Sequence, residues 1–147
     1  YAETFTHRSL VTTTWDLKLD GFPAGDIWLP RAPLVSVTSV SYTDTAGAAQ
    51  TWSSADYSVD APAGPECGPG RVIPDYGVSY PSTYGVPNCV TVRFVAGYGA
   101  ASSVPPMIKL CMKEHVRAAW LRGTGEESDS IMKWVHMQLW PYKVFGS

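Results

Sequence analysis

Cys111 and His115 have the residue types and the spacing for nucleophilic chemistry, because they lie four positions apart in a stretch with helical periodicity. Residues at this spacing share a helix face, where an imidazole can activate a neighbouring thiol. The sequence indicates neither a third group to orient the imidazole nor an oxyanion donor, so ordinary packing is the favoured interpretation. A nucleophile elbow, a phosphate-binding loop with lysine and an H-E-x-x-H helix are absent. We therefore predict no enzymatic activity and no cofactor.

Three aspartates, Asp16, Asp20 and Asp26, crowd one short segment and have the oxygen ligands that hard cations prefer. Their spacing matches no known loop motif, and aspartate is common in turns and on solvent-facing strand positions. The three histidines are too scattered for a zinc site; they are His7, His115 and His136. We therefore predict no metal site.

The cysteines do not form a recognisable framework. Cys67, Cys89 and Cys111 are odd in number and show no C-x-x-C spacing, so reduced thiols are expected. A Cys67–Cys89 bridge remains open, since both cysteines lie in loop-like sequence before strands. Cys111 is expected to be a small apolar core residue.

Composition limits the classes of function. The chain has 147 residues, 16% of them charged, with six Trp and eight Tyr. The rings suit either an ordinary core or a protein interface. Residues 1–104 carry five basic and nine acidic side chains, whereas residues 105–147 carry six and four. Because DNA binding depends on Lys and Arg, this balance argues against tight DNA binding.

No apolar run is long enough to cross a membrane, and no membrane partner is predicted.

Two groups of side chains are candidates for contacts between subunits or with a channel. Lys109, Lys113 and Arg117 fall at i, i+4 and i+8 and form one basic stripe on a predicted helix. This stripe is either a solvated face or a contact with an acidic neighbour or passing DNA. The loop of residues 76–84 carries three tyrosines that suit subunit contacts or sugar stacking; they are Tyr76, Tyr80 and Tyr84.

Periodicity predicts the elements that must position these residues. Alternation of apolar and polar residues predicts strands at 12–19, 26–29, 34–43, 50–52, 57–60, 71–74 and 89–98. The segment 26–29 is expected to return as a hairpin after the turn at Asp20-Gly21, and a bulge is expected near Thr38-Ser39.

Helical patterns flank the predicted strands. Residues 1–10 resemble the end of a helix. Ser103 is expected to cap a helix that begins at Pro105-Pro106 and stops at Gly123. Residues 124–127 resemble a capping box for a second helix that ends at Pro141. The tail has no obvious partner strand, so we expect another chain to bury it. Its candidate contact residues are Trp140, Pro141, Tyr142, Lys143, Val144 and Phe145.

The predicted fold class is α+β, with an antiparallel β-sheet domain inserted between an N-terminal helix and a C-terminal helical pair. We expect one domain over 1–147, made of a helix end (1–11), a β-rich insertion (12–99), two helices (103–140) and a tail (141–147).

The order and spacing of several segments resemble the head–tail connector, or adaptor (head-completion), proteins of tailed bacteriophages and gene transfer agents. The resemblance covers nearly the whole chain. The segments that carry it are Thr14-Trp15-Asp16-Leu17, Leu19-Asp20-Gly21-Phe22-Pro23, Ile27-Trp28-Leu29-Pro30-Arg31-Ala32-Pro33-Leu34, Val37-Thr38-Ser39-Val40-Ser41-Tyr42, Asp56-Tyr57-Ser58-Val59-Asp60, Gly70-Arg71-Val72, Val90-Thr91-Val92-Arg93-Phe94-Val95-Ala96-Gly97-Tyr98-Gly99, Val104-Pro105-Pro106-Met107-Ile108-Lys109 and Pro141-Tyr142-Lys143-Val144.

The resemblance implies a structural virion protein without enzymatic activity. Such a subunit forms a ring, commonly twelvefold, in the virion neck, and it is assembled in the cytoplasm of the bacterial host. Its partners are copies of itself, the portal protein and a tail-side stopper or terminator, with DNA passing through the channel without sequence-specific binding. We hypothesise that the tail, residues 140–145, docks onto the portal. The alternative function is a β-type carbohydrate-binding module on a virion or cell surface.

Overall fold

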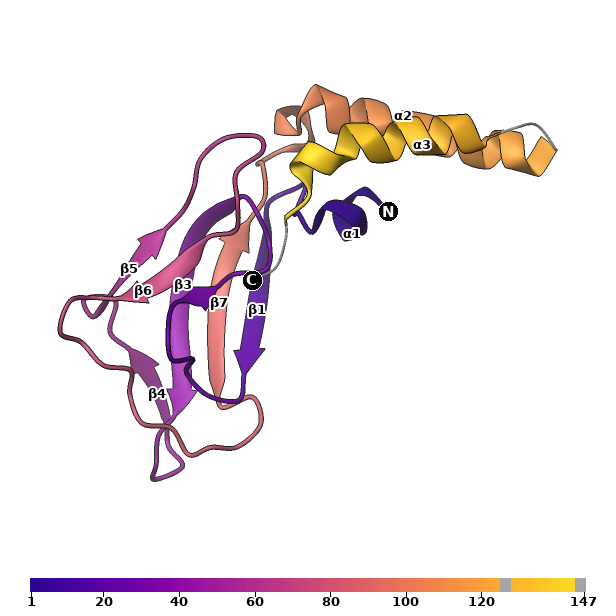
Figure 1. Cartoon of the computed structure of the whole chain (residues 1–147). Helices are drawn as coiled ribbons and strands as arrows, with labels where there is room; N and C mark the ends of the chain where they lie inside the picture. The colour runs from indigo at the N-terminus through magenta and orange to yellow at the C-terminus, as the bar shows by residue number, and fades with distance from the viewer. Residues whose placement is uncertain (125–127, 145–147) are drawn as a thin grey trace.

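The computed structural model describes residues 1–124 and 128–144, and its α+β architecture confirms the predicted fold class. A body of β-strands lies beside an arm of two long helices (Figure 1). The helices are α1 (Ala2–Thr6), α2 (Pro106–Thr124) and α3 (Asp129–Leu139), with short 3₁₀ turns η1 (Ala101–Ser103) and η2 (Trp140–Tyr142). The strands are β1 (Thr13–Leu19), β2 (Ile27–Trp28), β3 (Leu34–Thr43), β4 (Ala49–Trp52), β5 (Tyr57–Asp60), β6 (Arg71–Pro74) and β7 (Val90–Ala96).

A four-stranded antiparallel sheet runs in the order β1-β7-β3-β4. In β7, Val90, Val92 and Phe94 are buried on one face, which is the period-2 pattern that predicted this strand. The β3–β7 register shifts between Val37 and Ser39. The predicted bulge near residues 38–39 is therefore confirmed, and it reconciles the two halves of β3.

A smaller antiparallel sheet, β2-β6-β5, packs against the first. Its Ile27 and Val72 join the body's hydrophobic core together with Val40 and Val92 of the larger sheet. The hairpin expected between 12–19 and 26–29 is wrong, because β1 pairs with β7 and β2 pairs with β6. The partner strands β7 and β6 lie far along the chain and supply the core residues Val92 and Val72, respectively. We call residues 13–96 the sheet body.

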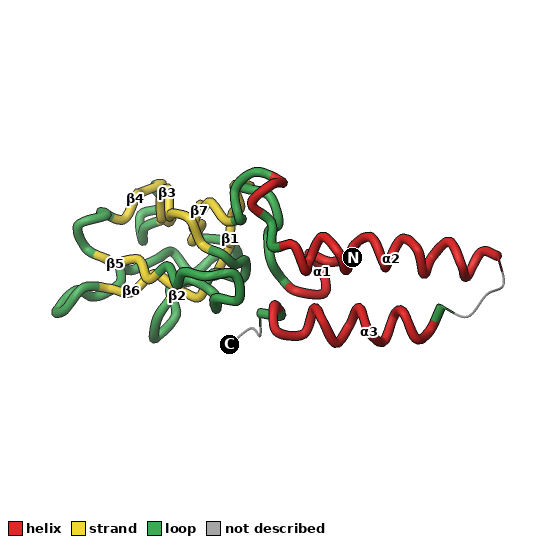
Figure 2. The backbone as a smooth tube through the Cα atoms, turned by 90° about the horizontal axis from the view of Figure 1, so that it is seen from above, coloured by secondary structure: helices red, strands yellow, loops and turns green. Residues whose placement is uncertain are grey.

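Helices α2 and α3 form a hairpin that projects sideways from the sheet body (Figures 1 and 2). We call this hairpin the helical arm. Ile108, Cys111, Val135 and Leu139 are buried in its core. The short helix α1 covers only the end of the arm nearest the sheet body (Figure 1), where Ala2 joins this core. Within the described residues, no helix is long and apolar enough to cross a membrane.

Several predicted helix boundaries require correction. The helix expected over residues 1–10 is the short α1, which ends where His7 adopts a left-handed conformation with φ 55°. Ser103 is no cap for α2, because it belongs to the separate turn η1. Helix α2 begins at Pro106, as expected, and continues past Gly123 to Thr124. Most of the expected capping box, residues 125–127, lies outside the described residues.

Arg8 links the sheet body to the tail that follows the arm. This guanidinium is almost completely buried, at 1% exposure. Its Nη2 donates to the carbonyl of Cys67 at 2.6 Å, and its Nε donates to the carbonyl of Tyr142. Beside it, the Val144 amide donates to the Thr6 carbonyl. The junction is therefore held by contacts among three segments that are distant in the sequence.

Candidate interaction surfaces

The structure opposes a reactive thiolate at Cys111. The Cys111 side chain is completely buried, and this burial raises its pKa above the usual value, whereas a nucleophile needs a lowered one. His115 stacks face to face on Tyr1, with ring centroids 4.1 Å apart. Both residues therefore pack the arm against α1, as the favoured interpretation of the sequence predicted.

The three clustered aspartates do not converge. Asp16 pairs with Arg93 on the neighbouring strand at 2.8 Å, and this hydrogen bond lowers the pKa of the Asp16 carboxyl. Asp26 pairs with Arg71 at 2.8 Å. The Asp20 carboxylate accepts a hydrogen bond from the Asn88 backbone amide at 2.8 Å. Across residues 1–124 and 128–144, no group of three or more His, Cys, Asp or Glu side chains is placed to hold a metal ion.

All three cysteines are free, so the bridge left open between Cys67 and Cys89 is wrong. Cys67 lies at the junction, where its carbonyl accepts the hydrogen bond from Arg8. The Cys89 thiol donates to the carbonyl of Asp20 at 3.1 Å, at the opposite end of β1 and β7. The length of these strands separates the two sulfur atoms.

The three tyrosines of the 76–84 loop have different environments. Tyr76 is fully exposed and Tyr84 is 58% exposed. Tyr80 instead stacks on Phe22 with ring centroids 4.8 Å apart, and its hydroxyl donates to the Gly25 carbonyl at 2.7 Å. Desolvation, followed by the nearby negative charge of Asp26, raises the Tyr80 pKa. Only Tyr76 and Tyr84 therefore present rings for a contact, which weakens the sugar-stacking alternative.

The predicted basic stripe lies on α2, and the structure gives each of its members a different role. Lys109 donates to the Ser102 carbonyl at 3.1 Å, and Arg117 lies 3.5 Å from Glu114. Lys113 is exposed. The stripe is thus partly used within the chain, and Lys113 is its most available charge.

Exposed apolar side chains lie beside this basic stripe, and the sequence analysis missed them. Met112, Val116 and Trp120 are 44%, 68% and 74% exposed. Their i, i+4, i+8 spacing was visible in the sequence, but helical periodicity alone does not show which of two apolar faces is covered. We call Met112, Lys113, Val116 and Trp120 the arm stripe.

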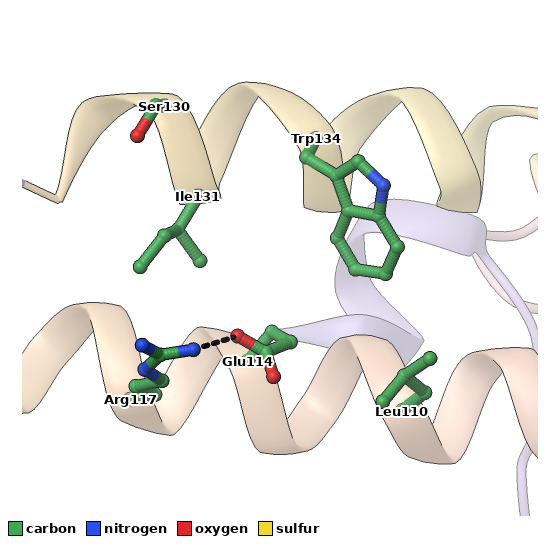
Figure 3. A pocket seen from close by; sticks show the side chains of 6 residues that line it. All are labelled: Leu110, Glu114, Arg117, Ser130, Ile131 and Trp134. Atoms are coloured by element: carbon green, nitrogen blue, oxygen red, sulfur yellow. Dashed lines mark hydrogen bonds and ion pairs between the residues drawn. The ribbon is translucent and has the colours of Figure 1, made fainter.

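A groove lies between the two arm helices on another side of α2 (Figure 3). It has a volume of about 450 Å³. Trp134 and Ile131 form its wall on α3, and the Arg117–Glu114 ion pair lies on α2 opposite them (Figure 3). The described residues that line it are Leu110, Glu114, Arg117, Ser130, Ile131 and Trp134.

The described part of the tail folds back onto its own chain. Val144 is 5% exposed and hydrogen-bonded to Thr6, the last residue of α1, so the expectation that another chain must bury the tail is wrong for this residue. The Tyr142 carbonyl is held by Arg8. Trp140 is 56% exposed, with the Lys143 ammonium 5.2 Å from its ring centroid. Phe145 lies outside the described residues.

Comparison with known proteins gives a clear result for the fold. No family model and no curated protein matches the chain. A chain from the neck of a native gene transfer agent (GTA) particle, computed with C12 symmetry, matches with a TM-score of 0.63 and 19% identity, over 99% of this chain and 77% of that one. A chain from the native GTA virion matches with a TM-score of 0.65 and 17% identity, over 99% and 72%.

A third similar structure is a chain from the neck of an empty GTA particle, computed with C6 symmetry. It has a TM-score of 0.62 and 19% identity, and the match covers 99% of this chain and 72% of that one. The class defined by these similarities is the fold of GTA neck and virion chains. This chain has that fold over almost its whole described length.

Proposed function

We propose that this protein is a structural subunit of the neck of a phage-like particle, where copies form a ring between the portal and a tail-side stopper or terminator. The observation that carries this proposal is the shared fold over 99% of the chain with neck chains of a particle computed with C12 symmetry. The proposed ring has about twelve copies, a number that the C12 symmetry used for that neck supports. The proposed location is the neck of a virion assembled in the host cytoplasm.

The surface of the chain supports an assembling part better than a catalyst. A closed ring needs two different surfaces on each copy, one for each neighbour. The helical arm projects away from the body and exposes large apolar side chains at Val116 and Trp120. The formal charge of −2 also suits a channel through which DNA moves without being held.

We propose further that the tail, residues 140–145, contacts the portal. Among its described residues, Trp140 and Lys143 are the best candidates, because the Trp140 side chain is 56% exposed and the Lys143 ammonium lies 5.2 Å from its ring centroid. An aromatic ring beside a cation is a common composition for an interface anchor.

Electron microscopy of purified particles and of the purified protein tests this function. We expect the density of this chain at the vertex between head and tail, and closed rings from the purified protein or from its complex with portal. A Trp140→Glu variant is expected to form rings but to attach poorly to portal. Thr45→Glu, in the exposed turn after β3, is the matched control. Density at any other position in the particle refutes the proposal.

A further inference from the structure

No element of residues 1–124 or 128–144 covers the outer edge of the helical arm. A helix turns by about 100° per residue, so positions two apart point in nearly opposite directions. Ala118 is completely buried, whereas Val116 and Trp120, two residues before and after it, are 68% and 74% exposed. The arm stripe therefore points away from the arm's own core. Three large apolar side chains exposed in a row on one helix face, Met112, Val116 and Trp120, indicate a partner.

The charge around the arm stripe restricts the chemistry of that partner. Helix α2 carries four basic side chains and one acidic side chain, a formal charge of +3. The sheet body, residues 13–96, carries four basic and eight acidic side chains, a formal charge of −4. A second copy of this chain therefore offers a surface of opposite sign to the arm.

One depression of the sheet body combines acidic and apolar groups. It has a volume of about 440 Å³ and lies where β6 meets the segment before β2. The carboxylates of Asp26 and Asp75 line it, and its lining contains no Lys or Arg. Its apolar lining includes Ile73, Pro74 and Tyr80. We call this depression the acidic groove.

The acidic groove lies within a wider acidic surface. Asp26 and Asp60 both pair with Arg71, at 2.8 and 2.9 Å, and these three groups leave a net charge of −1. Asp75, whose carboxylate accepts a hydrogen bond from Ser58, adds a further negative charge. A basic side chain entering here meets negative charge beside proline and tyrosine surfaces, which complement the methylene stem of a lysine.

We propose that the arm stripe of one copy docks on the acidic groove of the next copy, with Lys113 directed at Asp75 and with Val116 and Trp120 on the apolar lining. This inference rests on the proposed function and names the surfaces through which the ring closes. The two surfaces differ, so the contact is head-to-tail, and it leaves one free arm and one free groove at the ends of any open chain. The sideways projection of the arm lets a neighbouring body lie along it (Figure 2).

Charge favours docking of the arm stripe on the acidic groove over docking on the arm of a second copy. The arm stripe could instead enter the groove between α2 and α3 of a second copy. That arrangement brings two α2 helices of charge +3 together, and among the described lining residues of the groove Glu114 is the single acidic one. Like charges across an interface are unfavourable, whereas the arm and the body attract each other.

The test uses two variants that each damage one surface. Lys113→Glu reverses the charge of the arm stripe, and Asp75→Lys reverses that of the acidic groove. Lys133→Glu, an equal charge change at an exposed position of α3, is the matched control. Circular dichroism first confirms that each variant is folded. Sedimentation velocity then measures assembly across a range of protein concentrations.

We expect each single variant to weaken assembly by at least about tenfold, while Lys133→Glu assembles like the wild type. An equimolar mixture of Lys113→Glu and Asp75→Lys should also assemble, because the two unchanged surfaces attract each other and the two altered surfaces carry opposite charges. Combining both substitutions in one chain restores the opposite charges, so assembly should return.

Three results overturn the inference. Normal assembly of both single variants excludes this contact but leaves the neck function standing. Loss of assembly in Leu110→Lys, a change in the groove between α2 and α3, together with normal assembly of Asp75→Lys, favours arm-to-arm docking. A wild-type chain that stays monomeric at millimolar concentration excludes a self-sufficient contact, and microscopy of the particle tests the neck function independently.

Discussion

Replacing the buried Arg8 with methionine should destabilise the whole protein, although no charged partner pairs with it among the described residues. Methionine keeps much of the side-chain volume but removes the donors to the carbonyls of Cys67 and Tyr142. Each hydrogen bond from a charged donor contributes about 1.5–3 kcal/mol, and the two partly buried carbonyls then lose their donor. We expect the free energy of unfolding to fall by about 3–5 kcal/mol.

Such a loss corresponds to a fall in Tm of roughly 10 °C for a chain of this size. Thermal and urea unfolding followed by circular dichroism measure it. Arg8→Lys should recover only part of the loss, because one ammonium does not reproduce the fork of donors on a guanidinium. The control is Arg31→Met, since Arg31 stacks over the Trp15 ring at 4.6 Å, a contact that contributes about 1 kcal/mol.

A second measurement separates the role of Arg8 at the junction from general packing. Hydrogen exchange of the Val144 amide, which donates to Thr6, should accelerate more in Arg8→Met than the amides of β7 do. Two results refute this role of Arg8. One is a free energy of unfolding for Arg8→Met within about 1 kcal/mol of the wild-type value. The other is a Val144 amide whose exchange accelerates no more than that of the β7 amides.

The remaining predictions concern the sheet body. Gly97→Ala should lower the free energy of unfolding in urea by about 3 kcal/mol or more. The reason is that Gly97 has φ 138° and that an added Cβ would lie 2.5 Å from the backbone oxygen of Val11. Gly21→Ala is the control, because Gly21 has open space around it and the change should have little effect. Tyr80→Phe should lose about 1 kcal/mol with its hydroxyl hydrogen bond, and an unchanged urea midpoint would contradict that role. Arg93 lowers the folded-state pKa of Asp16 by hydrogen bonding, so its contribution is present above the ordinary aspartate pKa and is lost as pH falls through the lower folded value. Asp16→Asn should therefore flatten the acid side of the stability curve, and an unaltered slope would exclude this pair as its source.

Local periodicity was sufficient for most elements of this fold. The alternation around Val90, Val92 and Phe94 predicted β7, and the pattern of residues 34–43 predicted β3 together with its bulge. Both arm helices were predicted from their apolar spacing. These elements could be predicted because each buries one face. The apolar residues of a buried face then recur every second position in a strand and every three to four positions in a helix, which can be read directly from the sequence.

The candidate surfaces were predicted less completely. The basic stripe on α2 was visible in the sequence, but the apolar stripe at Val116 and Trp120 was not separated from the helix core. Tyr80 was grouped with Tyr76, although one packs on Phe22 and the other is fully exposed. Spacing within a loop carries no information on which ring turns inward, because that depends on partners far away in the chain.

The sequence by itself determined where the strands and helices lie, the absence of any recognised catalytic motif and the opposite charges of α2 and the sheet body. Only the tertiary structure decided that β1 pairs with β7 and that Arg8 joins Cys67 to Tyr142. The physical reason is the range of the interactions. Helical and strand periods depend on residues a few positions apart, whereas strand pairing and buried hydrogen bonds are selected by the packing of the whole chain.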